Sequence, residues 1–312
     1  MSTIHQLEPT RQTLHGHFSS DLTPVLTIDP GDTVHFRTLD ANWGLESYTA
    51  GKGIERAEFR DRVSPEDDGH ALTGPVAIRG AKPGMTLEIQ IGAIIPGAYG
   101  ACLTGGWPSA MNERLGIVHD PVIHVYDLDP ETMTGRNQHG HSVALRPFMG
   151  VMGVALDTPG QHSTIPPRRW GGNMDCKELV TGSTLYLPIG VEGGLFSTGD
   201  GHAAQGDGES GGTAIECPME RVELTFHLRD DLPLTTPVAK TPAGWLTLGF
   251  HEDLDEAAMI ALEAMFGLMG RQYGIGRVDA IALTSVVVDL HVTQIVNGVK
   301  GVHALLPFGA LR

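Results

Sequence analysis

The sequence predicts a mainly β protein with a small α+β part near its C-terminus. Glycine supplies 41 of the 312 residues, while aromatic residues make up only 6%. This glycine content is about twice the usual share, and the glycines are spread along the chain rather than gathered in a linker. Such a distribution is typical of many short strands joined by turns. Only one segment, residues 254–269, repeats its apolar residues at sustained helical spacing.

Turn signals separate the expected strands. Pro30-Gly31-Asp32 lies between two apolar segments in residues 25–36 and predicts a hairpin or a corner. A second corner, Pro83-Gly84, precedes residues 87–91, where apolar and polar residues alternate as in a half-buried strand. Further strands are expected at residues 122–126, 148–156, 185–191, 213–215, 221–228, 245–250 and 285–296.

The remaining segments are predicted to form a surface excursion and one helix. Residues 39–68 are polar and irregular and are expected to run over the surface. The helix is expected to start at Asp253, because Glu256 completes a capping-box pattern, and to stop at Gly270 and Gly274. We divide the chain into an N-terminal β-rich region (1–150), a central β region (151–235) and a C-terminal α+β region (236–312). Together they are expected to form one composite catalytic unit.

Charge and composition restrict the function. The chain has 21 basic and 37 acidic residues and a net charge of -16, which argues against nonspecific binding to nucleic acid or to an anionic membrane. The N-terminal residues lack the pattern of a signal peptide, and no apolar run is long enough to span a membrane, so a cytoplasmic location is expected. The three cysteines have no CxxC spacing and are expected to be free thiols.

Residues 197–216, STGDGHAAQGDGESGGTAIE, are the strongest candidate for an active-site segment. Asp200, His202, Asp207 and Glu209 are all of types that bind metals or transfer protons. The glycines among them allow sharp turns and a close approach to a ligand. Apolar segments on both sides are expected to anchor this loop, although the same residue types also occur in ordinary solvated turns.

Two other segments offer candidate ligands. Residues 162–179 contain Trp170, Asn173 and Asp175 beside Gly171-Gly172, so they suit either a binding loop or a rigid solvated loop. His15 and His17 are two residues apart, which on a strand directs both imidazoles to one face. That spacing permits a metal ligand but also two exposed histidines.

Several common catalytic motifs are absent from the sequence. It contains no HExxH, no GxSxG and no Walker loop. Cys176-Lys177-Glu178 holds the residue types of a thiol amidase, but consecutive residues point in different directions and cannot meet at one substrate atom.

The combined motifs resemble the acetamidase/formamidase family. The resemblance runs through Gly74-Pro75, the Gly80-Ala81-x-Pro83-Gly84 corner, the GGNMD segment at 171–175 and GDGHAAQGDGE at 199–209. It covers nearly the whole chain, and the last motif is the most specific. Met85 differs from the aspartate that often follows this Pro-Gly in the family. The resemblance implies a composite β-sandwich and barrel-like fold with a small α+β region, and assembly into homo-oligomers.

The resemblance also implies hydrolysis of short aliphatic amides to a carboxylate and ammonia, with a bound divalent metal, zinc by preference and calcium as the alternative. We expect Asp200 and His202, with Asp175 or His15, to hold the ion. Glu209 is expected to act as general base and then as proton donor. Asn173 or a loop N–H would stabilise the oxyanion. Gly172 and Asp207 are expected to contact substrate, although Asp207 could exchange roles with another acid.

Two alternatives use the same residues. A non-catalytic β-sandwich module could bind calcium or a sugar through the acidic loop, since calcium prefers six to eight oxygen ligands. The central histidine and the absence of EF-hand spacing favour a transition metal instead. The family fold could also act on a different amide.

Overall fold

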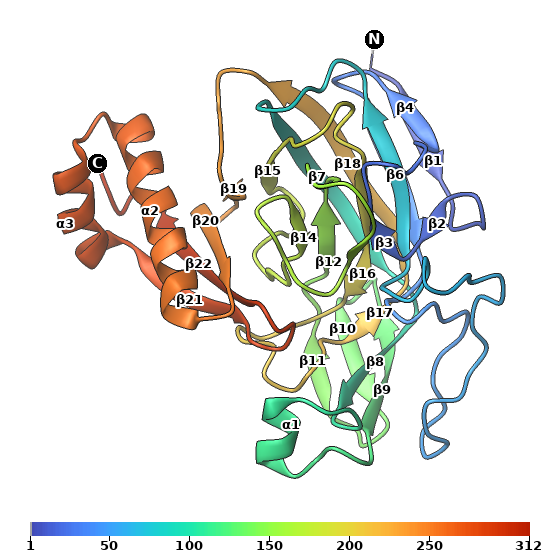
Figure 1. The fold of residues 1–312 in the computed structure, drawn as a ribbon. Helices are drawn as coiled ribbons and strands as arrows, with labels where there is room; N and C mark the ends of the chain where they lie inside the picture. The colour runs from blue at the N-terminus through green and yellow to red at the C-terminus, as the bar shows by residue number, and fades with distance from the viewer. Residues whose placement is uncertain (1) are drawn as a thin grey trace.

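The structure, a computed structural model, describes residues 2–312 and confirms the mainly β prediction. Strands account for 39% of the chain and helices for 12%. The strands form two large open sheets and one two-stranded ribbon. Figure 1 shows the β layers in the centre and two helices with their own strands to one side.

The first large sheet has nine strands and includes the strands next to the C-terminal helices. From one edge to the other its strands are β1 (Ile4–Leu7), β5 (Thr33–Thr38), β18 (Met219–Arg229), β7 (Thr86–Pro96), β15 (Thr184–Pro188), β19 (Val238–Lys240), β20 (Gly244–His251), β22 (Lys300–Pro307) and β21 (Asp289–Gln294).

The second sheet has eleven strands and carries the glycine-rich motifs. Its main path is β11 (Ser142–Ala144), β10 (Thr134–Asn137), β9 (Val122–Asp129), β8 (Tyr99–Thr104), β17 (Glu216–Cys217), β16 (Phe196–His202), β12 (Phe148–Gly153) and β14 (Gly171–Asn173). A branch from β16 contains β6 (Leu72–Ile78), which pairs with β2 (Leu14–His15) and β4 (Leu26–Ile28). The ribbon consists of β13 (His162–Ser163) and β3 (His17–Phe18).

The two large sheets share one hydrophobic core, as expected of a sandwich. Phe196 of the second sheet packs edge-to-face against Phe36 and Phe226 of the first, with ring centroids 6.1 and 5.1 Å away. These buried aromatic rings therefore fix the distance between the two sheets.

Both predicted Pro-Gly turns are corners at which the chain changes sheet, between β4 and β5 and between β6 and β7.

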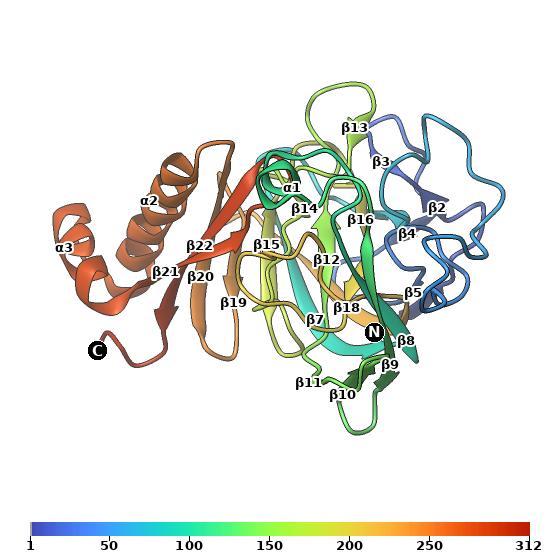
Figure 2. The same cartoon turned by 90° about the horizontal axis from the view of Figure 1, so that it is seen from below.

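The predicted helix is confirmed as α2 (Leu254–Tyr273). Asp253 caps its N-terminus by accepting hydrogen bonds from the backbone N–H groups of Asp255 and Glu256, and Gly274 ends it in the left-handed conformation. Its buried face packs on β20 and β22 and forms a second core with α3. Figure 2 shows both helices on the same side of this part of the sheet.

Three expectations about local structure are wrong. Residues 285–287 end the helix α3 (Arg277–Val287) instead of starting a strand, because packing against α2 outweighs the strand preference of the valines. Residues 213–215 are irregular, although Ala214 and Ile215 are buried, and the strand begins at Glu216. A short helix, α1 (Ala110–Leu115), is capped by Ser109 in a region without helical periodicity.

Strands from all three predicted regions contribute to the nine-stranded sheet. The excursion over residues 39–68 is irregular, as expected, but it is anchored by the buried Trp43 and by a buried ion pair between Arg56 and Asp40. Across residues 2–312, the helices are all too short or too polar to cross a lipid bilayer.

Candidate metal centre

Pairing between neighbouring strands brings the acidic motifs together. Strand β16 lies between β12 and β17, and His202 is directly opposite Glu216 in the β16–β17 pair. Asp175 follows β14, which pairs with the other edge of β12. Strands far apart in the sequence therefore lie side by side at β16, where Figure 1 shows β12 and β14 on one side.

Five buried side chains form two overlapping groups with metal-ligand geometry. Asp175, Asp200 and His202 each present a ligand atom within 4.8 Å of the others, and so do His202, Glu209 and Glu216. The exposed fractions of the five residues run from 1% for His202 to 8% for Glu216. We call Asp175, Asp200, His202, Glu209 and Glu216 the buried cluster.

The backbone at the buried cluster is held in an uncommon conformation. Asp175, Asp200 and Glu209 have φ values of 49°, 57° and 47°, in the left-handed region that non-glycine residues rarely adopt. They are three of the six such residues in the chain from 2 to 312. Strained residues of this kind concentrate at functional sites, where the surrounding structure compensates their cost.

Gly150 of β12 leaves the space that the cluster occupies. A Cβ atom at this position would lie 2.5 Å from Asp200 Oδ2, 2.8 Å from Asp175 Oδ1 and 2.8 Å from His202 Cε1. The absence of a side chain at Gly150 therefore allows two carboxylates and the imidazole to converge.

Several oxygens near this space are buried without a hydrogen bond, although Glu216 Oε2 lies 3.3 Å from His202 Nε2. Asp175 Oδ1, Glu209 Oε2 and Glu216 Oε2 have no hydrogen bond to any group in residues 2–312, and the Oδ1 atom of Asn173 is in the same condition. Buried carboxylate oxygens without partners are costly, and a cation relieves that cost. The donor set of one imidazole and several carboxylates fits a divalent metal ion.

His202 is oriented by the glutamine of the same loop. Its Nδ1 donates to Gln205 Oε1 over 2.9 Å, and Gln205 Nε2 donates to the carbonyl of Asp175 over 2.8 Å. The other ring nitrogen, Nε2, is directed at Asp200 Oδ1 and Glu216 Oε2, both 3.3 Å away. A metal-binding histidine is commonly fixed in this way, by a hydrogen bond from its second nitrogen.

The ionisation of the cluster in the metal-free protein follows from its burial. Burial raises the pKa of Asp175 to about 7 and that of Glu216 to about 8. The negative charge of Asp200 adds to both increases. Burial and the charge of Asp175 also raise the pKa of Glu209. The carboxylates of Glu216 and Asp200 outweigh burial and raise the pKa of His202. The metal-free cluster thus retains protons that a divalent ion would displace.

These shifts predict how the stability of the metal-free protein depends on pH. Free carboxyl groups titrate at about pH 4, so the folded state binds more protons than the unfolded state between that value and the raised pKa values. The stability contributed by Asp175 and Glu216 is present below about pH 4 and is lost as the pH rises through 7 to 8. We expect the thermal midpoint of the metal-free protein to fall between about pH 5 and about pH 8.

Circular dichroism with and without added zinc measures this effect. Zinc is expected to remove most of the decline, because the ion replaces the protons. A metal-free midpoint that stays constant or rises over this interval would contradict the assigned ionisation of the cluster.

The other residues predicted for the site lie outside the buried cluster. His15 is hydrogen-bonded through Nδ1 to the carbonyl of His17 and through Nε2 to Ser197 Oγ, so the structure does not bring it to the cluster. Asn173 Nδ2 donates to the carbonyl of Ile165. Asp207 Oδ2 contacts His291 and Lys177, at 3.0 and 3.3 Å.

Three residues of the site were missed from the sequence. Glu216 was included only as the last residue of segment 197–216 and was given no role. Its position beside Cys217 in a buried strand could have marked it as a site residue. Gly150 lies within the strand expected at residues 148–156, and nothing in that segment marks it as part of a site. Asn297, which donates to Asp175 Oδ2 over 2.5 Å from the β21–β22 turn, carries no local sequence signal.

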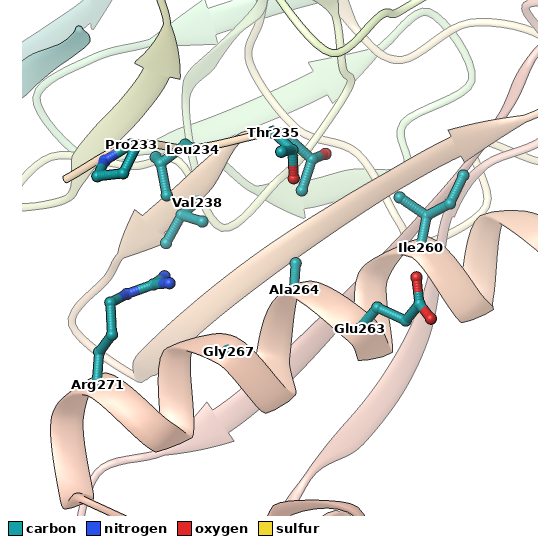
Figure 3. Close-up of a pocket in the computed structure, with 10 residues that line it drawn as sticks. Pro233, Leu234, Thr235, Val238, Ile260, Glu263, Ala264, Gly267 and Arg271 are labelled. Atoms are coloured by element: carbon teal, nitrogen blue, oxygen red, sulfur yellow. The ribbon is translucent and has the colours of Figure 1, made fainter. Parts of the chain in front are cut away.

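The surface pocket in Figure 3 is separate from the cluster. It has a volume of about 410 Å³ and lies between helix α2 and the segment before β19. Leu234, Val238, Ala264 and Arg271 are among the residues that line it, and no residue of the buried cluster does so.

Comparison with known proteins gives a consistent result. The model of the Acetamidase/Formamidase family matches residues 2–162 and 158–308. An acetamidase of Mycolicibacterium smegmatis is 52% identical over 255 residues, which cover 62% of this chain and 61% of that protein. A formamidase of Methylophilus methylotrophus is 25% identical over 246 residues, covering 63% of this chain and 59% of the relative. The chain thus spans about three fifths of the length of these two relatives.

A solved structure extends the similarity to the whole fold. The acetamidase from Bacillus halodurans superposes with a TM-score of 0.83 and 28% sequence identity, over 97% of each chain.

Proposed function

Because this chain belongs to the acetamidase/formamidase family, we propose that it hydrolyses short aliphatic amides, of the formamide and acetamide type, to a carboxylate and ammonia. The relatives are named for these activities. The observation that carries the proposal is the group of buried carboxylate oxygens around His202 that have no hydrogen bond. Such a group is suited to hold a metal ion in a site from which water is largely excluded.

The proposed ligands are His202 Nε2 and the carboxylates of Asp175, Asp200 and Glu216. When bound, a divalent ion, zinc by preference, supplies positive charge that polarises an amide carbonyl and favours the ionisation of water near neutral pH. Gln205 holds the His202 ring in place, and Asn297 holds Asp175. His15 is not carried into this proposal because both of its ring nitrogens have other partners.

Glu209 is proposed as the group that transfers protons. Its carboxylate would take a proton from the attacking water as the new C–O bond forms. It would then donate that proton to the amide nitrogen as the C–N bond breaks, which releases ammonia and the carboxylic acid, and the acid loses its proton to give the carboxylate. Burial raises the pKa of Glu209, so its carboxyl can hold the proton that it donates, and the positive charge of a nearby cation would lower this pKa and let the group also accept a proton.

Roles for the other predicted residues are weaker proposals. Asn173 could stabilise the oxyanion only by releasing the carbonyl of Ile165, to which its amide now donates. Gly172 is proposed to contact substrate through its backbone. Asp207 is not carried forward as a substrate contact, since its partners are His291 and Lys177. The expected homo-oligomer and cytoplasmic location also remain proposals.

Release of ammonia before and after metal removal tests the proposal. The purified protein is expected to turn over formamide or acetamide, to lose that activity after a chelator has removed its metal, and to regain it with zinc. Turnover that persists after confirmed metal removal would contradict metal catalysis. Bound calcium with no turnover of any short amide would instead support the alternative binding module, to which a buried histidine ligand is poorly suited.

A further inference from the structure

A second group of potential metal ligands lies outside the buried cluster. Asp207, His291 and His303 each offer a ligand atom within 4.8 Å of the others. They come from the loop after β16, from β21 and from β22. We call these three residues the hairpin cluster.

Strand pairing explains why the two histidines meet. His291 and His303 are directly opposite each other in the antiparallel β21–β22 pair, so their side chains lie on the same face of the sheet. Their rings stack with centroids 4.8 Å apart and planes 3° from parallel. The hairpin therefore holds the two imidazoles side by side on one face of the sheet.

Backbone hydrogen bonds attach the acidic loop to this hairpin. Gly208 N donates to the carbonyl of Thr293 over 3.0 Å, and Ile295 N donates to the carbonyl of Gly208 over 3.2 Å. These bonds place Asp207, the neighbour of Gly208, beside the histidine pair, and its Oδ2 lies 3.0 Å from His291 Nδ1. In Figures 1 and 2 the hairpin extends from the helical part of the protein toward the motif strands.

His303 has an unused ring nitrogen at this position. The residue is fully buried, and its Nδ1 is 2.9 Å from Thr293 Oγ1. Its Nε2 has no hydrogen-bond partner in residues 2–312. Burying such a nitrogen without a hydrogen bond costs free energy. The hydrogen bond to Thr293 fixes the orientation of the ring, as a hydrogen bond to the other ring nitrogen does in a metal-binding histidine.

We propose that Asp207, His291 and His303 form a second site for a divalent transition metal, distinct from the buried cluster. Two imidazoles and one carboxylate suit zinc, cobalt or nickel and do not suit calcium or magnesium. An ion there replaces the hydrogen bond between His291 and Asp207. It clamps the C-terminal hairpin, which carries Asn297, to the loop that carries Gln205 and Glu209.

A purely ionic network is the competing explanation. Lys177 Nζ lies 3.3 Å from Asp207 Oδ2 and 2.6 Å from Glu178 Oε1, and Arg146 also contacts Glu178. The positive charge of Lys177 opposes a second cation near Asp207, so the hairpin cluster is expected to bind zinc more weakly than the buried cluster. The network alone leaves His303 Nε2 unpartnered, whereas the metal site does not.

Metal stoichiometry of the full chain tests the proposal. Equilibrium dialysis against zinc is expected to give two equivalents for the natural protein and one for His291→Ala. His303→Gln, which retains much of the side-chain volume, is also expected to bind one. His124→Ala, on β9 and outside both clusters, is the matched control and is expected to bind two. Cobalt bound at the hairpin cluster should add visible absorption that both hairpin variants lack.

The outcomes separate this proposal from the proposed function. Asp200→Asn should remove the other equivalent and leave the one held by the hairpin cluster. A natural protein that binds one equivalent, lost in Asp200→Asn and retained in His291→Ala, overturns the second site and leaves the amidase proposal intact. One equivalent with the opposite pattern supports the second site and removes the metal from the buried cluster.

Discussion

Replacing Gly150 with alanine is expected to weaken zinc binding at the buried cluster strongly and to abolish amide hydrolysis. The new methyl carbon would lie 2.5 Å from Asp200 Oδ2 and 2.8 Å from Asp175 Oδ1, closer than non-bonded atoms tolerate. Gly150 does not have a positive φ, so the backbone accepts alanine and the conflict concerns the side chains of Asp200, Asp175 and His202. We expect zinc affinity to fall by at least about 100-fold, the upper end of what loss of an orienting partner costs.

The substitution should leave the protein folded. Inserting one methyl group into a packed region typically costs about 1–3 kcal/mol, which is less than the stability of an ordinary domain. Equilibrium dialysis and ammonia release, with thermal unfolding to verify folding, measure the effect. Gly206→Ala is the matched control, because a Cβ atom there meets nothing within 4 Å. A folded Gly150→Ala protein with normal zinc affinity would show that the ion is bound elsewhere.

Replacing Glu209 with glutamine is expected to preserve metal binding and to remove turnover. The two side chains have nearly the same size, but the amide cannot accept and return a proton. General acid–base catalysis typically contributes about 10²–10⁴-fold to rate, so kcat for acetamide or formamide should fall by that factor. The zinc content should stay close to that of the natural protein, since Asp175, Asp200, His202 and Glu216 remain.

Two further variants make this result specific. Glu220→Gln changes an exposed glutamate whose partner is Arg37, and it is expected to leave kcat unchanged. Glu216→Gln removes a proposed ligand and should lower zinc affinity together with activity. Full activity in a metal-loaded Glu209→Gln protein would show that another group acts as the base, and Glu216 of the same group is one candidate.

Local sequence patterns were sufficient to predict an element when all of its signals lie within one continuous segment. The helix α2 was predicted with its cap because Asp253, the apolar spacing and Gly274 lie within one continuous stretch. Strands such as β18 and β20 were predicted from alternation or from a short apolar run. The helix α3 was missed because its valines prefer strands, and only packing against α2 decides in favour of a helix.

The sequence by itself determined the family, the mainly β class and four members of the buried cluster: Asp175, Asp200, His202 and Glu209. Their residue types and their density among glycines are local properties. Only the tertiary structure decided that Glu216 faces His202, that Gly150 leaves room for the ligands, and that His15 lies elsewhere. The physical reason is strand register. A shift by one residue moves every side chain to the other face of the sheet, and the pairing that sets the register joins segments distant in the chain.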